Sequence, residues 1–269
     1  MRLLISLLLV LAALLSPLAG RGAAHPRAIP HAAGGAAATR GACPAMPAVA
    51  PAGYRAVVRD DFTAPVLDAR TWFRWSGEPG SDPFGWWDTP RAVAGRGALR
   101  LGGQWVSTGG NPRWRSGGEV TSGIGSRRTL RYGEYSWCMR VDNMPGTSTI
   151  ALLWPAGARQ WPPEIDLFET KGSTTAYSVT LHYGTARENL IVRRFVVRRD
   201  ATRWHVYTAT WGPGLIRVAE DGSVVATISG NPHVPSVPMR FDIQTQAVRH
   251  HPVLGTTTVG WVVEYARTR

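Results

Sequence analysis

Three carboxylates stand within six residues of this chain, at Glu164, Asp166 and Glu169 in the segment EIDLFE. The residues between them are apolar, which predicts a largely buried strand in which a charged group costs free energy. Side chains alternate along a strand, so Glu164 and Asp166 share a face, and strict alternation would turn Glu169 to the opposite face. A β-bulge between Asp166 and Glu169 would absorb one residue and return Glu169 to the acidic face. We therefore predict a bent strand that presents all three acids on one surface.

Two carboxylates that flank a sugar bond perform glycoside hydrolysis, one attacking the anomeric carbon and the other protonating the leaving oxygen. Crowded like charges raise one another's pKa values, so Asp166 is expected to hold Glu164 in place and to help keep Glu169 protonated. A retaining mechanism needs about 5–5.5 Å between the two catalytic carboxyl groups, a separation that a bent strand permits but does not prove. The alternatives are a solvated acidic edge and a calcium-binding strand of a lectin-like sandwich.

The chain after Tyr54 supplies the elements that must position these acids. Short apolar segments, several of them alternating with a period of two, are separated by Gly, Pro, Asn and Asp, and no long amphipathic helix is evident. The expected strands lie at 97–103, 133–141, 148–155, 163–170, 176–184, 189–197, 203–211, 215–228, 238–246 and 259–267. Asp221-Gly222 predicts a hairpin turn. We expect an all-β fold, a jelly-roll β-sandwich of the concanavalin A type with antiparallel sheets and a concave substrate groove.

The N-terminal region has the layout of a secretory signal peptide. Arg2 precedes an apolar run over 3–15, and a Pro and small residues follow, so we assign a signal peptide to 1–24. The run is short for a transmembrane helix, although a signal anchor is the alternative, and no later segment is apolar enough to span a membrane. Residues 25–53 are rich in Ala, Gly and Pro and predict a linker before a domain at 54–269. We expect a secreted, extracellular protein without stable membrane insertion.

The net charge indicates which binding partners to expect, and the cysteines indicate a covalent link. The formal net charge is +12, and Lys171 is the only lysine among the basic residues. The arginines are scattered, which disfavours nucleic-acid binding and weakly favours attraction to an anionic cell wall or polysaccharide. The two cysteines, Cys43 and Cys138, predict a disulfide in an oxidising compartment, with a buried thiol at Cys138 and an unpaired Cys43 as the alternative.

The acidic segment resembles the E-x-D-x-x-E motif of glycoside hydrolase family 16, the jelly-roll endo-glucanases and their relatives. Other segments resemble the family in the same order along the chain. They are DDFTAPVLDARTW at 60–72, VTSGIGS at 120–126, YGEYSWCMRV at 132–141, IALLWP at 150–155, TLHYG at 180–184, WHVYTATWGPGLIRVAEDG at 204–222 and VVEYARTR at 262–269. The resemblance covers nearly all of 54–269. Pro163 departs from a common Gly, and FGWWDTPRAV at 84–93 replaces the N-E-x-Q-Y-Y segment of many laminarin-cleaving members.

The resemblance implies a role for each acid, with Glu164 as the nucleophile, Glu169 as the general acid/base and Asp166 as the assisting carboxylate. Several aromatic and polar residues are candidates for substrate binding, and core packing is the alternative for each. These candidates are Trp154, Trp161, His182, Trp86, Trp87 and Gln246. Asp61 and Glu264 are possible remnants of the family's calcium site, which uses acids near both ends of the domain.

Together these observations predict a secreted, retaining endo-glycosidase that hydrolyses β-glucan with β-1,3 or mixed β-1,3/1,4 linkages by double displacement. We expect a monomer whose partner is the polysaccharide, with no nucleic acid, no required cofactor and, at most, a structural calcium ion. The alternatives are a transglycosylase, a hydrolase of another polysaccharide such as galactan or xyloglucan, and a non-catalytic carbohydrate-binding sandwich.

Overall fold

The computed structural model describes residues 41–79, 84–107, 118–157, 161–185 and 187–268. By its contacts the chain divides into two compact units, Met1–His31 and Ala32–Arg269, and all described residues belong to the second. The signal peptide expected at 1–24 and the first part of the expected linker lie outside the described residues. Within the described ranges, no helix is long and apolar enough to cross a membrane.

The described part of the chain is built mainly from strands, as the alternating apolar segments predict. It also holds a short 3-10 helix, η1, at Thr89–Arg91. The strands are β1 (Tyr54–Asp60), β2 (Trp72–Arg74), β3 (Gly85–Trp87), β4 (Ala92–Gly95), β5 (Ala98–Gly102), β6 (Gln104–Val106), β7 (Gly118–Thr121), β8 (Gly123–Ser126), β9 (Gly133–Val141), β10 (Thr147–Pro155), β11 (Glu164–Glu169), β12 (Ala176–Thr185), β13 (Glu188–Arg198), β14 (His205–Gly212), β15 (Leu215–Glu220), β16 (Ser223–Ser229), β17 (Met239–Ala247) and β18 (Thr256–Arg267).

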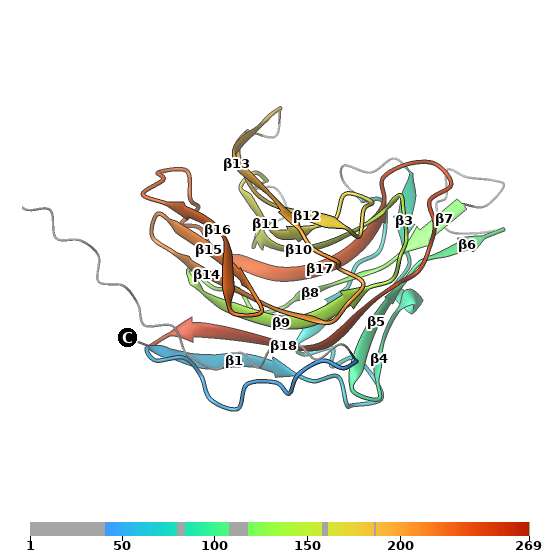
Figure 1. The fold of residues 1–269 in the computed structure, drawn as a ribbon, viewed down its shortest axis with the longest axis horizontal. Helices are drawn as coiled ribbons and strands as arrows, with labels where there is room; N and C mark the ends of the chain where they lie inside the picture. Colours follow the sequence, from blue (N-terminus) through green and yellow to red (C-terminus); the bar gives the residue numbers. More distant parts are fainter. Residues whose placement is uncertain (1–40, 80–83, 108–117, 158–160, 186, 269) are drawn as a thin grey trace, which may run out of the picture. The chain divides into compact units, whose positions relative to one another are not determined.

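Two large antiparallel sheets face each other in the described unit (Figure 1). One has eight strands in the order β16-β15-β14-β9-β18-β5-β4, with β1 also paired to β18. The other has seven strands in the order β13-β12-β11-β10-β17-β8-β2. A small third sheet, β3-β7-β6, contains the parallel pair β3 and β7. The acidic strand β11 therefore lies inside the seven-stranded sheet, between β10 and β12.

The core lies between the two large sheets because both turn apolar side chains inward. The rings of Tyr135 and Trp137 on β9 lie 5.6 and 5.3 Å from the ring of Phe241 on β17, so aromatic contacts join the two sheets. Burying one such side chain stabilises the fold by roughly 1.5–3 kcal/mol. The all-β sandwich expected from the sequence is confirmed.

The hairpin between β15 and β16 turns at the predicted place. Asp221 and Gly222 have positive φ values of 49° and 79°. Two consecutive positive φ values define the two-residue turn that Asp-Gly favours, because this turn matches the twist of the flanking strands.

The segment before β1 packs on the face of the eight-stranded sheet that points away from the core. Cys43 forms a disulfide with Cys138 of β9, with their Cα atoms 6.2 Å apart. The indole Nε1 of Trp261 on β18 donates to the carbonyl of Pro44 at 2.7 Å, and Met46 packs on the same apolar patch. The described end of the expected linker is therefore held against the domain, because it covers apolar surface that would otherwise face water.

Candidate active site

The predicted β-bulge is present in β11. The register with β12 shifts between Asp166 and Glu169. The two residues between these acids, Leu167 and Phe168, both turn into the core, so the strand skips one step of its alternation. Glu164 and Glu169 are partly exposed, whereas Asp166 is buried. We call the side of the seven-stranded sheet that carries these three acids the acid-bearing face.

Glu164 and Asp166 are each fixed by an aromatic ring. The indole Nε1 of Trp161 donates to Oε2 of Glu164 at 2.7 Å. The Nε2 of His182 lies 2.9 Å from Oδ2 of Asp166, and its Nδ1 lies 3.0 Å from Oδ1 of Asn189 on β13. An imidazole whose two nitrogens both face oxygen acceptors makes both hydrogen bonds as the imidazolium. His182 can therefore balance the charge of Asp166.

Lys171 is the cation next to Glu169, and sequence reasoning assigned it no role in the site. Its Nζ lies 2.5 Å from Oε2 of Glu169. Its backbone has a positive φ of 50°, and its N–H donates to Oγ of Ser148 at 2.9 Å. The sequence offers one hint of its position, because Lys171 is the only lysine of the chain and stands two positions after Glu169.

Burial and mutual repulsion shift the titration of this cluster. Burial raises the pKa of Glu164 well above its usual value, and the neighbouring Asp166 raises it further. Burial and then Asp166 also raise the pKa of Glu169, while Lys171 lowers it. Burial lowers the pKa of His182, but Asp166 more than offsets this and leaves it raised. Burial and the neighbouring charge therefore favour the protonated forms of Glu164 and Glu169.

Two indoles stand next to Glu164. The rings of Trp154, on β10, and Trp161, just before β11, have centroids 6.4 Å apart and planes inclined by 15°. Both side chains are partly exposed. Flat, partly exposed indoles beside carboxylates suit stacking against sugar rings. The structure thus brings Trp154, Trp161 and His182 to the acids.

The other candidates for substrate binding lie farther from the acids. Gln246 of β17 is buried, and Nε2 of Gln244 donates to its Oε1 at 3.4 Å. Trp87 is also buried, its Nε1 donating to the carbonyl of Thr245 at 2.9 Å. Burial leaves Trp87 and Gln246 little surface for a substrate, so packing is the role that the structure shows for them. Trp86 takes part in neither of these two contacts, and its side chain is partly exposed on β3.

One row of side chains crosses the whole seven-stranded sheet on the acid-bearing face. Consecutive members are cross-strand partners, from β13 at one edge to β2 at the other. This central row is Arg194, Thr180, Asp166, Leu152, Asp242, Gly125 and Phe73. Neighbouring strands lie ~4.8 Å apart, so the row runs across the strands and joins Asp166 to both edges of the sheet.

The β2 end of the central row is aromatic. The rings of Phe73 and Trp75 lie 5.1 Å apart, and the guanidinium of Arg240 lies 5.3 and 5.1 Å from their centroids. The Nε of Arg240 is 3.2 Å from both carboxylate oxygens of Asp242. Gly125 is required here because a Cβ at this position would overlap the ring of Phe73. Sequence reasoning missed this aromatic end, which residues from β2, β8 and β17 build together.

The structure does not join Asp61 and Glu264 in a calcium site. Asp61 is exposed, and its Oδ1 accepts hydrogen bonds from the backbone and the hydroxyl of Thr63. Glu264 is fully buried opposite the core residue Tyr135, so alternation along β18 turns it inward. Among the described residues, no converging group of three metal-ligating side chains includes either acid.

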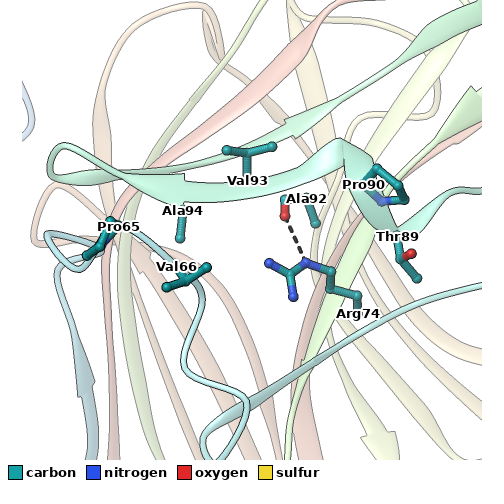
Figure 2. A pocket seen from close by; sticks show the side chains of 8 residues that line it. All are labelled: Pro65, Val66, Arg74, Thr89, Pro90, Ala92, Val93 and Ala94. Carbon is teal, nitrogen blue, oxygen red and sulfur yellow. Dashed lines mark hydrogen bonds between the residues drawn. The ribbon is translucent and has the colours of Figure 1, made fainter.

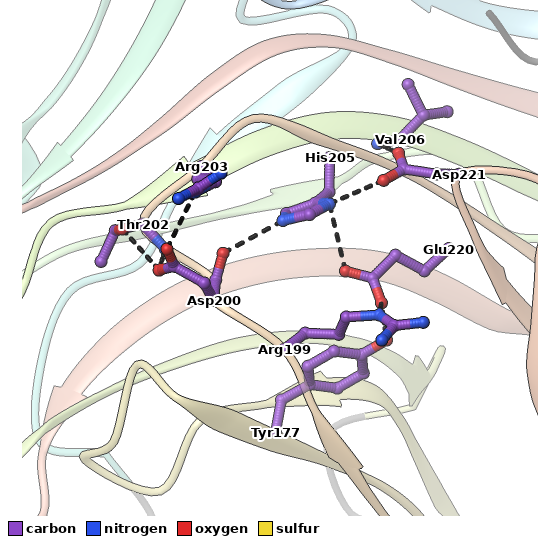
Figure 3. Close-up of polar contacts among 9 residues, drawn as sticks. All are labelled: Tyr177, Arg199, Asp200, Thr202, Arg203, His205, Val206, Glu220 and Asp221. Atoms are coloured by element: carbon purple, nitrogen blue, oxygen red, sulfur yellow. Dashed lines mark hydrogen bonds and ion pairs between the residues drawn. The ribbon is translucent and has the colours of Figure 1, made fainter. Parts of the chain in front are cut away.

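A second cluster of acids and a histidine lies outside the acid-bearing face, at β14 and β15 (Figure 3). The Nδ1 of His205 lies 2.8 Å from Oδ2 of Asp221 and 3.2 Å from Oε1 of Glu220. Arg199 and Tyr177 both donate to Oε2 of Glu220, at 3.1 and 3.2 Å. We call these five residues the neutralised cluster, because cations and a hydroxyl surround its acids.

Two groups of described residues hold donor types that suit a metal ion. They are Glu164, Asp166 and His182 on the acid-bearing face, and His205, Glu220 and Asp221 in the neutralised cluster. In each group the histidine already lies within hydrogen-bonding distance of a carboxylate.

A cavity of about 260 Å³ lies away from the acids, beside β4 (Figure 2). Its lining residues are Pro65, Val66, Arg74, Thr89, Pro90, Ala92, Val93 and Ala94. The Nε of Arg74 donates to the carbonyl of Ala92 at 2.9 Å. No carboxylate or histidine lines this cavity, so it cannot supply an acid and base pair.

Comparisons with known proteins agree with this fold. The model of the glycosyl hydrolases family 16 matches residues 104–259. The laminarinase catalytic domain of Thermotoga maritima superposes with a TM-score of 0.68 at 14% identity, over 80% of this chain and 99% of that chain. A β-1,3-1,4-glucanase (lichenase) from a mouse hindgut metagenome gives a TM-score of 0.65 at 18% identity, over 78% and 99% of the two chains.

A third solved structure shows that the structural neighbours are not limited to proteins described as β-glucanases. It comes from work on endo-acting O-glycanases that human gut microbiota express to initiate mucin breakdown. Its TM-score is 0.69 at 15% identity, over 83% of this chain and 94% of that chain. A search of curated protein sequences finds no match.

Identities this low show a shared fold and leave the substrate open. The family match is more direct, because it spans more than half of the 269 residues and contains β11 with its bulge and its acids. The chain therefore belongs to the glycosyl hydrolases family 16.

Proposed function

We propose that this protein is a secreted, retaining endo-glycosidase that hydrolyses β-glucan with β-1,3 or mixed β-1,3/1,4 linkages. The observation that carries this proposal is the bulge in β11, which turns Glu164, Asp166 and Glu169 to one face. The laminarinase and the lichenase among the structural neighbours support a β-glucan substrate. The apolar leader and the disulfide between Cys43 and Cys138 support export to an oxidising compartment.

In this proposal the two outer acids share the chemistry. Glu164 attacks the anomeric carbon while Glu169 donates its proton to the leaving oxygen, which forms a covalent glycosyl-enzyme. Glu169 then takes a proton from the water that breaks this intermediate. The hydrogen bond from Trp161 favours the ionised form that Glu164 needs as a nucleophile, and it opposes burial and Asp166, which raise the pKa of Glu164. Asp166, held by His182, raises the pKa of Glu169 and so favours the proton that the first step consumes.

A panel of polysaccharides tests the reaction and its substrate. The purified protein is incubated with laminarin, mixed-linkage β-glucan, xyloglucan, agarose and mucin O-glycans, and the products are identified by mass spectrometry. We expect oligosaccharides of several lengths from laminarin or mixed-linkage β-glucan, together with an early fall in polymer length. Products from another polymer alone would replace β-glucan as the substrate, and an absence of products from every polymer would contradict the proposal.

Chemical rescue separates the roles of the two acids. Azide should replace the missing nucleophile in Glu164→Ala and give an α-glycosyl azide. In Glu169→Ala, azide should instead attack the covalent intermediate and give a β-glycosyl azide. Glu188→Ala, which changes an exposed acid on β13, is the matched control and should keep full activity without azide. The reverse pairing of products would exchange the two roles.

A further inference from the structure

The β13 edge of the acid-bearing face is cationic. Arg194 belongs to the central row, two strands from Asp166. Phe195 and Val197 pack against the core, so alternation places Arg194 and Arg198 together on the acid-bearing face. Both arginines are exposed, and neither has an ion-pair partner among the described residues.

Two other arginines near the ends of the central row show the contrasting arrangement. Arg199, one residue beyond Arg198, has its Nε 3.1 Å from Oε2 of Glu220. At the other end of the central row, Arg240 is paired with Asp242. Arg199 and Arg240 thus each have a carboxyl partner within the protein, whereas the side chain of Arg194 is exposed on the acid-bearing face.

Apolar side chains accompany these unmatched charges. Val196, two residues after Arg194 on the same face, is 66% exposed. Ile191, the cross-strand partner of His182, is 42% exposed. An exposed aliphatic side chain can contact the apolar face of a sugar ring, and a nearby guanidinium can bind an anionic substituent through paired N–H donors.

We propose that the polysaccharide substrate carries carboxylate or sulfate groups, and that Arg194, assisted by Arg198, binds them at the β13 edge of the acid-bearing face. This inference rests on the proposed glycosidase function and names the substrate class more closely. The Cα of Arg194 lies roughly 10 Å from that of Asp166, two strand spacings away, so we assign Arg194 to substrate binding and not to the reacting bond. The net charge of +12 also steers anionic polymers toward the protein.

The test uses one β-glucan in three forms, namely unmodified, carboxymethylated and sulfated. At low ionic strength, we expect the wild-type kcat/KM for at least one anionic form to exceed that for the neutral form by about threefold or more. Added salt should reduce this preference, because it screens exposed charges. Arg194→Gln should remove most of the preference, measured as the ratio of kcat/KM on the anionic form to kcat/KM on the neutral form. The carboxymethylated and sulfated arms identify which anion is preferred.

Arg55→Gln is the matched control, because Arg55 is an exposed arginine on β1 in the other sheet. It removes the same charge and should keep the preference. Equal cleavage of neutral and anionic forms, or an equal loss in Arg194→Gln and Arg55→Gln, would overturn the inference.

A binding measurement keeps the inference separate from catalysis. In native gels that contain each polymer, Glu164→Gln should be retarded more by an anionic form than by the neutral form. The double variant Glu164→Gln with Arg194→Gln should lose that extra retardation. Cleavage of the neutral glucan without this difference contradicts only the inference. A difference in retardation without cleavage of any polymer contradicts only the proposed glycosidase function.

Discussion

The acid-bearing face and the neutralised cluster contain the same kinds of side chains, but their acids have different partners. In the neutralised cluster, Glu220 is 2% exposed and is held by Arg199 and His205, while Asp221 is held by His205. Each acid there has a basic or hydroxyl partner, so the cluster ties β14 and β15 to neighbouring elements.

On the acid-bearing face, three acids share two basic side chains. Only His182 and Lys171 stand within ion-pair distance of them among the described residues. Glu164 has an indole as its hydrogen-bond partner and remains partly exposed. The comparison teaches that acids become chemically useful where cations are too few to match them and a substrate can reach them.

Removing one carboxylate from each cluster gives the largest expected effect. Glu164→Gln should lower kcat on the cleaved glucan by about 10³-fold or more, because it removes the proposed nucleophile. Glu220→Gln should keep wild-type kcat at a temperature where it remains folded. Initial rates with circular dichroism of the same samples check both statements, and comparable loss of kcat in the two folded variants would contradict the comparison.

The same two variants should rank in the opposite order for stability. Glu220→Gln weakens the pairs with Arg199 and His205 in a buried place, and should lower the free energy of unfolding by about 1–3 kcal/mol. Glu164→Gln removes an acid whose charged form burial disfavours, so its stability should be unchanged or higher. Urea unfolding followed by tryptophan fluorescence measures both. A Glu164→Gln variant less stable than Glu220→Gln would show that the acid-bearing face also holds the fold together.

Glu264, which is fully buried and forms no ion pair with the other described residues, sharpens the comparison. Burial raises the pKa of Glu264 from its ordinary 4.5 to about 8. The folded state therefore prefers the protonated form, and its stability is full at low pH and is lost as pH rises from 4.5 toward 8. From this group alone, the free energy of unfolding should fall by up to about 1.4 kcal/mol per pH unit.

Glu264→Gln tests that expectation, because it keeps the shape of the side chain and removes its titration. The variant should match the wild type at about pH 5 and be more stable at about pH 8. Asp242, whose pKa burial also raises to about 8, should leave part of the pH dependence in place. Identical stability profiles for the variant and the wild type would show that Glu264 does not titrate as its burial requires.

The smallest effect concerns the cation beside the proposed acid/base. Lys171 lowers the pKa of Glu169, so removing its charge in Lys171→Met should raise that pKa further. Since Glu169 must be protonated to donate, the alkaline limb of the kcat/KM profile should move to higher pH. Lys171→Arg keeps the charge and should leave the limb in place. A shift to lower pH in Lys171→Met would mean that another group controls this limb.

Much of β11 could be predicted before the fold was known. The offsets between Glu164, Asp166 and Glu169 put all three acids on one face only if the strand bulges, and this constraint is local. Lys171 could not be placed in the same way, because a positive φ beyond the strand end turns its side chain back toward Glu169.

The sequence also did not reveal that the side chain of Glu264 points into the core. Val262 on one side of the alternation and Val263 on the other are both apolar, and both faces of β18 are buried. With apolar residues on both faces, period-two alternation does not say which face meets the core. Calcium ligation by Glu264 therefore looked possible from the sequence, whereas the fold turns this acid inward.

By itself the sequence determined the all-β class, the positions of most long strands, the Asp221-Gly222 turn and the acids of β11, because alternation and turn chemistry act between near neighbours in the chain. Only the tertiary structure decided which charges meet. His182 reaches Asp166, Arg199 reaches Glu220 and Arg194 reaches no acid through cross-strand register and bulges. Register depends on contacts between distant segments, so the pairing of charges that separates a reactive cluster from a neutralised one is a property of the folded sheets.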